Sequence, residues 1–137
     1  MELDLRTHDR RALSAVEAAD RGEFDYAKSV VIDLIAEDWN NAQAHRAWGR
    51  VLLAEGKTAD AVASYRTAVS LDPRRADVHF DLAEALLADF GANPFVPHTN
   101  WVEARQAVAD GLARTANHAR GNNILARIEQ AREHSLT

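Results

Sequence analysis

Small and apolar residues recur at the three- and four-residue spacing of amphipathic helices along most of the chain. In the first stretch this spacing joins Ala12, Val16 and Ala19, and Gly22 then interrupts it. Because glycine accepts the left-handed backbone that ends many helices, Gly22 marks a helix end. The pattern resumes at Tyr26 and continues in the same way. It predicts an all-α chain of about seven helices.

The helical pattern itself repeats every 34 residues. Gly22 and Asp38 align with Gly56 and Asp72 when the chain is shifted by this period. A period of about 20 to 50 residues is the signature of a repeat array. A single helix pair cannot bury its apolar face, so the stack of pairs is expected to be the stable unit.

The clearest copy of the period, residues 42–75, resembles the tetratricopeptide repeat (TPR). The resemblance rests on Trp48, Gly49, Leu52, Gly56, Ala61, Tyr65, Ala68 and Pro73. It implies a right-handed α–α superhelix, the TPR solenoid, in which one domain spans residues 8–137 after a lead-in at 1–7. The expected units are the repeats 8–41, 42–75 and 76–118 and a capping helix at 119–134.

The third copy departs from the period by nine residues, which predicts an insertion near residues 88–100. Pro94 and Pro97 cannot lie inside a helix, and Asn100–Glu103 has the pattern of a capping box that starts one. The apolar side chains of this segment are expected either to cover the core edge or to form an exposed contact for a partner or a second copy. They are Phe90, Phe95, Val96 and Trp101.

The resemblance also implies a binding site, because the first helix of each TPR pair lines a concave surface that holds a partner segment. At the matching positions the predicted groove residues are Val16, Arg46, Arg50, Leu53, Phe80, Asp81, Glu84, Leu87, Asn123 and Arg127. Two interpretations of the charges stay open. Arg46 and Arg50 either neutralise acidic residues of the next repeat or bind a carboxylate or phosphate of a partner. The acidic residues concerned are Asp77, Asp81 and Glu84.

One TPR subclass grips the C-terminal carboxylate of chaperone tails with lysine, asparagine and arginine. The matching positions here hold Ala12, Val16, Ala47, Asp77 and Asp81. Two carboxylates in place of cations repel an anionic chain end. A clamp of that kind is therefore not expected.

Composition narrows the class of function. The 137 residues are 47% hydrophobic and carry a net charge of −5, which suits a compact domain and makes a poor nucleic-acid binder. There is no cysteine, and no apolar run approaches the length of a membrane span. A cytoplasmic location is expected. Fourteen arginines against two lysines suggest a bacterial source.

Neither a catalytic residue, a metal nor a cofactor is expected. Gly56–Thr58 imitates the end of a phosphate-binding loop but lacks the earlier glycine and the preceding strand. His45 and His79 occupy equivalent repeat positions without an evident third ligand, and His98 and His118 have no catalytic partner. The expected function is a non-catalytic protein-interaction module or adaptor. The alternative is a scaffold subunit that assembles with copies of itself.

Overall fold

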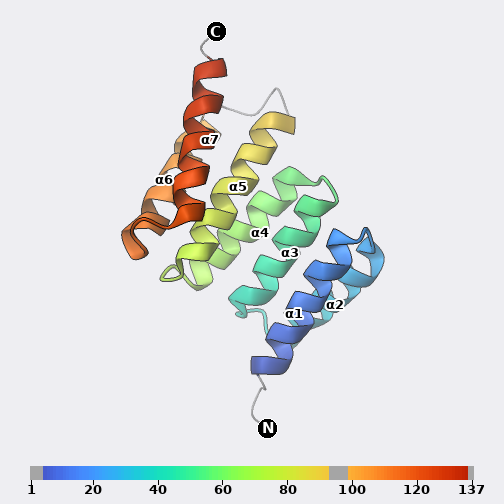
Figure 1. The fold of residues 1–137 in the computed structure, drawn as a ribbon. Helices are drawn as coiled ribbons and strands as arrows, with labels where there is room; N and C mark the ends of the chain where they lie inside the picture. Colours follow the sequence, from blue (N-terminus) through green and yellow to red (C-terminus); the bar gives the residue numbers. More distant parts are fainter. Residues whose placement is uncertain (1–4, 93–98, 136–137) are drawn as a thin grey trace.

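The computed structural model describes residues 5–92 and 99–135, which form seven helices (Figure 1). They are α1 (Leu5–Asp20), α2 (Phe24–Glu37), α3 (Ala42–Ala54), α4 (Thr58–Leu71), α5 (Ala76–Ala92), α6 (Thr99–Arg114) and α7 (Ala119–Ser135). The first five helices are separated by connections of three or four residues. Connections this short make consecutive helices antiparallel neighbours. The prediction of an all-α chain is confirmed.

The helices stack in pairs, from α1 and α2 at one end of the molecule to α6 and α7 at the other (Figure 1). Each helix contacts the next one along the chain. In addition, α1 contacts α3, α3 contacts α5 and α5 contacts α7. The odd-numbered helices therefore form a continuous layer.

The turns inside the first two pairs follow the repeat. Gly22 and Gly56 have φ values of 84° and 87°, the left-handed region in which other residues are strained. Asn41 begins α3 as a side-chain cap, and its Oδ1 accepts from the backbone N–H groups of Gln43 at 3.0 Å and Ala44 at 3.3 Å. Local sequence signals thus set where these helices begin and end.

The apolar core consists of two clusters that meet at α3. The first joins α1, α2 and one side of α3, and its largest members are Val31, Leu34 and Val51. The second joins the rest of the stack through Phe80, Leu86, Val108, Ile124 and Ile128. Trp48 on α3 packs against both clusters. It therefore connects the first helix pair to the remainder of the molecule.

The predicted insertion is helical in its first part. Ala88 is the position equivalent to the end of α3, but α5 continues to Ala92. The next helix, α6, already begins at Thr99, so Asn100 lies inside it. The prediction that the helix starts from an Asn100 cap was wrong, because the Asn100 side chain is used elsewhere.

Buried Asp89 receives that side chain. Its Oδ2 accepts from Asn100 Nδ2 at 3.2 Å, and its Oδ1 accepts from Thr58 Oγ1 at 2.8 Å. These two hydrogen bonds fasten the starts of α6 and α4 to the extended end of α5. The extra helical turn of α5 thus has polar partners on both neighbouring helices.

Candidate partner-binding groove

A hollow of about 570 Å³ lies on the face made by the odd-numbered helices. Two stripes with the same helical spacing form most of its lining: Asp9, Ala12, Leu13 and Val16 on α1, and Gln43, Arg46, Ala47 and Arg50 on α3. The two stripes are related by the 34-residue period. The rest of the lining consists of Tyr65, Arg75, Asp81 and Arg120.

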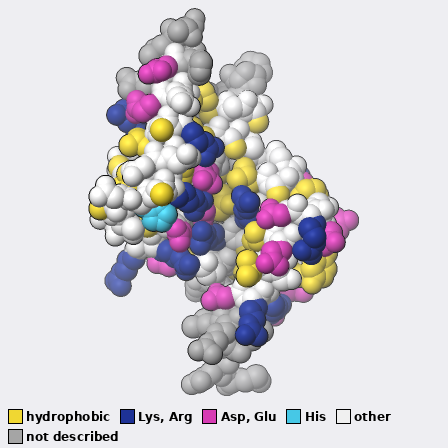
Figure 2. Space-filling model, in the orientation of Figure 1, with side chains coloured by type: hydrophobic (Ala, Val, Ile, Leu, Met, Phe, Trp, Pro, Cys, Tyr) yellow, Lys and Arg dark blue, Asp and Glu magenta, His cyan; other side chains and the backbone are white. Residues whose placement is uncertain are grey.

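Charged side chains of both signs gather in the middle of this face, between α1 and α7 (Figure 2). Asp81 on α5 forms ion pairs with Arg46 of α3 and, at 2.6 Å, with Arg120 of α7. Arg120 also binds Glu84 at 3.0 Å, and Arg127 lies 4.0 Å from the same carboxylate. This network joins three neighbouring helices of the odd-numbered layer.

The pKa of Arg120 reflects this network. Burial alone lowers the pKa of a guanidinium, but the hydrogen bonds and charges of Glu84 and Asp81 outweigh burial and raise it above its ordinary value. Arg120 therefore stays charged and paired.

Arg46 and Arg50 have different partners, which distinguishes the two interpretations of their charges. Arg46 neutralises Asp81 of the next repeat, so the first interpretation is confirmed for that pair. Arg50 instead reaches back to α1, where its Nη2 lies 3.5 Å from Asp20 Oδ1, and both side chains are about half exposed. An exposed pair of this kind contributes little free energy. Arg50 is therefore accessible to a ligand.

Tyr65 enters the groove from the second layer. Its ring, 2% exposed, lies over Gly49, where a Cβ atom would stand 2.8 Å from the ring. Burial raises the pKa of Tyr65 well above its ordinary value; the charge of Asp81 adds to the rise and the nearby arginines oppose it. Within the part of the chain that the structure describes, the Tyr65 hydroxyl forms no hydrogen bond, and it is not among the fully buried atoms that lack one. The groove floor thus holds a neutral, unused donor.

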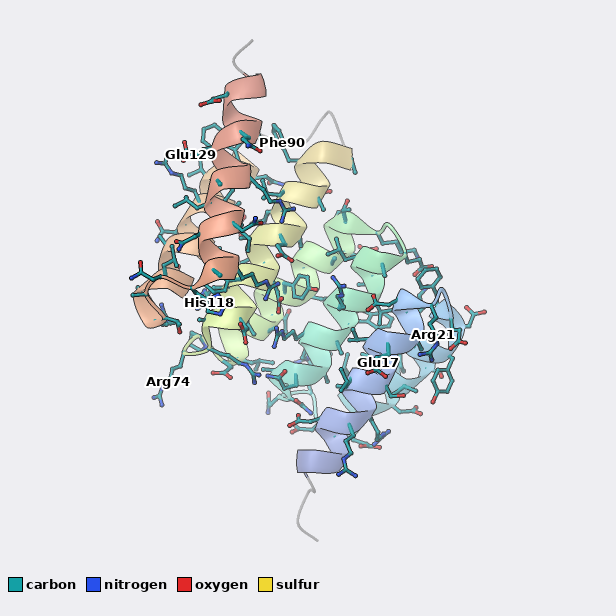
Figure 3. All side chains as sticks on the ribbon, in the orientation of Figure 1. Glu17, Arg21, Arg74, Phe90, His118 and Glu129 are labelled. Atoms are coloured by element: carbon teal, nitrogen blue, oxygen red, sulfur yellow. The ribbon has the colours of Figure 1, made fainter. Side chains whose placement is uncertain are left out.

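Four of the predicted groove residues line the hollow: Val16, Arg46, Arg50 and Asp81. The prediction for Phe80 was wrong, because this side chain is fully buried. Its ring fills the space left by Gly111 and Gly121, where Cβ atoms would approach to 2.4 Å and 2.8 Å. Its ring centroid also lies 5.1 Å from that of His118, at the start of α7 (Figure 3). Phe80 belongs to the core.

The remaining predicted residues lie outside the hollow. Leu53 and Leu87 are half-buried and pack against the second core cluster. Glu84 belongs to the ion-pair network, while Asn123 and Arg127 are exposed on α7. A role of these residues in binding stays a prediction.

The predicted loop contacts are only partly described. Phe90 and Trp101 are half-buried, and Phe90 lies near the C-terminal end of α5 (Figure 3). Phe95 and Val96 lie outside the described residues. The two interpretations of this segment, a core cover and an exposed contact, stay predictions.

Sequence reasoning missed Arg120, Arg75 and the position of Tyr65 on the groove floor. The period contains a signal for Arg120, because this residue matches Asp9 and Gln43 once the insertion is allowed for. All three residues line the hollow. In the sequence, Tyr65 stood out only as one of the residues that carry the TPR resemblance.

The two equivalent histidines are structural. Nε2 of His45 donates to the carbonyl oxygen of Trp39, and Nε2 of His79 donates to that of Pro73, each at 2.7 Å. Over residues 5–92 and 99–135, no group of three or more His, Asp or Glu side chains is placed to hold a metal ion. In the same ranges, none of the helices combines the length and apolar character needed to cross a bilayer.

Stacked antiparallel helix pairs with a lined hollow on one layer define the class of helical-repeat solenoids. Residues 49–89 match the family model of the TPR repeat. The seven described helices fit three such repeats followed by a capping helix. The chain has the fold of a TPR solenoid over its described residues. No sequence among curated proteins matches it significantly.

Solved structures share the fold over nearly the whole chain. The translocator chaperone SycD of type III secretion in Yersinia enterocolitica is 20% identical, with 96% of this chain and 90% of that one covered at a TM-score of 0.73. Its complex with a peptide of the translocator YopD gives 19% identity, coverages of 93% and 95%, and a TM-score of 0.71.

A further similar structure is the first TPR of Spaghetti (RPAP3) bound to an HSP90 peptide. It is 20% identical, with coverages of 90% and 94% and a TM-score of 0.69. At these identities the similarity establishes the fold alone.

Proposed function

We propose that this protein is a non-catalytic interaction module that holds a segment of a partner protein in the groove between α1, α3 and α5. The observation that carries the proposal is the hollow of about 570 Å³, whose lining combines apolar side chains with accessible arginines. Two similar folds were solved with bound peptides, which supports peptide binding as the function of this fold. A groove with a few charged groups among apolar ones favours one orientation of an extended segment.

Selection from an unbiased displayed-peptide library tests the proposal, followed by affinity measurements on the selected peptides. Arg50→Glu should weaken their binding by about tenfold or more, because a charged hydrogen-bond donor of the groove is replaced by an acid. Its circular dichroism spectrum and melting temperature should stay close to those of the parent, since the Arg50–Asp20 pair is exposed.

Arg105→Glu is the matched control. Arg105 is also about half exposed and also lies 3.5 Å from a single carboxylate, that of Glu129, but it does not line the hollow. Equal effects of the two reversals, or a library that yields no binder, contradict the proposal.

Self-assembly is a second candidate, because Tyr26 and Ile32 on α2 and Trp39 in the connection after it are exposed to more than half of their areas. Light scattering over a range of concentrations distinguishes the two functions. A strict monomer excludes assembly.

A further inference from the structure

We infer that the partner segment carries an aspartate or glutamate next to an aliphatic residue, with the carboxylate bound by Tyr65 and Arg50 and the aliphatic side chain against Leu13. The inference rests on the proposed function, since it specifies what the groove binds. The three contacts lie in one hollow and come from α4, α3 and α1.

The first observation is the unused donor of Tyr65. This hydroxyl is not among the fully buried atoms that lack a partner, so it opens into the hollow and can donate to a ligand there. The groove is the side on which Tyr65 reaches the surface, and four charged groups act on it there: Arg46, Arg50, Asp81 and Arg120. An acceptor that enters the groove completes the hydrogen bond.

The second observation is the charge of the lining. Four arginines line the hollow against two aspartates, although the whole chain has a net charge of −5. Asp81 is paired with two of these arginines, whereas Asp9 has no ion pair among the described residues, so the lining as a whole keeps a net positive charge. Among the described residues Arg75 has no ion pair, and Arg50 has only its exposed contact with Asp20. This net positive charge attracts a carboxylate to the hollow.

The third observation is the apolar wall. Leu13 is 58% exposed, and half-buried Val16 continues the same stripe of α1. Across from it, the position equivalent to Leu13 on α3 is Ala47, whose small side chain leaves room. An aliphatic side chain that removes Leu13 from water gains hydrophobic free energy.

The apolar residues of α1 and the guanidinium of Arg50 lie at equivalent positions along neighbouring helices. Val16 and Arg50 are equivalent residues of neighbouring repeats, and α1 and α3 are in contact. The aliphatic and acidic residues of the partner are therefore close together in its sequence. This pairing differs from recognition of a chain end, because it needs no terminal carboxylate.

Fluorescence anisotropy with defined peptides tests the inference. The probe is a short labelled peptide of leucine, glutamate and serine, acetylated and amidated so that neither end is charged. Three companion peptides carry glutamine for glutamate, lysine for glutamate, or serine for leucine. Each companion should bind about tenfold more weakly than the probe, or worse, because each loses one of the two recognised groups.

Variants locate the contacts. Tyr65→Phe keeps the ring over Gly49 and breaks no hydrogen bond among the described residues, so it should fold normally. Tyr65→Phe and Arg50→Gln should each lower the affinity for the glutamate probe by about tenfold. Arg50→Gln should change the affinity for the glutamine peptide by less than about twofold. The matched controls are Tyr26→Phe and Arg105→Gln, whose side chains are exposed and lie outside the hollow.

The outcomes separate the two claims. If library peptides bind the groove but the glutamate, glutamine and lysine peptides bind equally, the inference is overturned and the proposed function stands. If neither library nor probe peptides bind, the proposed function itself fails. If the protein forms oligomers that Arg50→Gln dissolves, a second copy occupies the groove and the inference is again overturned.

Discussion

Gly49 is the residue that brings Tyr65 close to α3. Replacing Gly49 by alanine places a methyl group 2.8 Å from the Tyr65 ring, closer than van der Waals contact permits. Since the added methyl group must displace a buried ring, Gly49→Ala should lower the free energy of unfolding by about 1–3 kcal/mol in chemical denaturation.

Gly91 provides the control for this prediction. It lies in α5, and a Cβ atom there would meet no neighbour within 4 Å. Gly91→Ala should leave stability unchanged or raise it by up to about 1 kcal/mol, because alanine is the better helix former. Equal stability of the two variants is incompatible with a tight Gly49–Tyr65 contact.

Phe80 shows what a single residue's position in the repeat leaves undetermined. The period places Phe80 at the position equivalent to Arg46, which does line the groove. The ring nevertheless turns inward because Gly111 and Gly121, far along the chain, leave space for it. The sequence pattern of a helix predicts where a residue lies on that helix. Whether its side chain turns into the core depends on the size of the residues on the neighbouring helices, here two glycines.

At the scale of elements, the sequence predicted the helices well wherever the period holds. Gly22, Gly56 and Asn41 begin or end helices for local reasons that are visible in the sequence. The insertion was harder, because the length of α5 depends on Asp89, whose hydrogen-bond partners lie on α4 and α6. Such contacts are tertiary, and no local pattern reveals them.

An ion pair between α2 and the end of α3 gives the structure a defined response to acid. Lys28 Nζ donates to Glu55 Oε1 at 2.7 Å, and this hydrogen bond lowers the pKa of Glu55 below its ordinary value of 4.5. A lowered carboxyl pKa adds stability that is complete above the ordinary pKa and is lost as the pH falls through the lowered one. Glu55→Gln should therefore reduce the loss of stability between about pH 5 and pH 3.

Denaturation at a series of pH values measures this slope. Glu17→Gln is the control, because Glu17 is exposed and has no ion pair among the described residues. It should leave the acid response of the parent unchanged. A Glu55→Gln protein with the parental slope shows that the Lys28 pair has no part in acid stability.

On the scale of the whole molecule, each repeat contacts only its neighbours, so the ends of the stack open most easily. Arg120 fastens the start of the last helix to Asp81 and Glu84. Arg120→Gln should speed amide hydrogen exchange in the first turns of α7 more than elsewhere in the chain. Mass spectrometry of exchanged fragments measures the effect.

Arg66→Gln serves as the comparison, because Arg66 pairs with Glu103 between α4 and α6 and not with α7. Unchanged exchange in α7 of the Arg120 variant means that apolar packing alone holds the end of the stack. The sequence predicted a capping helix at this end, but it did not reveal the arginine that ties it to the groove.

The division of the core at Trp48 places the two sides of the groove in different packing units. Leu13 and Val16 belong to the unit held by the first cluster, whereas Tyr65, Asp81 and Arg120 belong to helices of the second. A small rotation of one unit against the other about α3 would change the distance between Leu13 and Tyr65 without unfolding either unit. A ligand that contacts both Leu13 and Tyr65 therefore joins the two units and stiffens the stack.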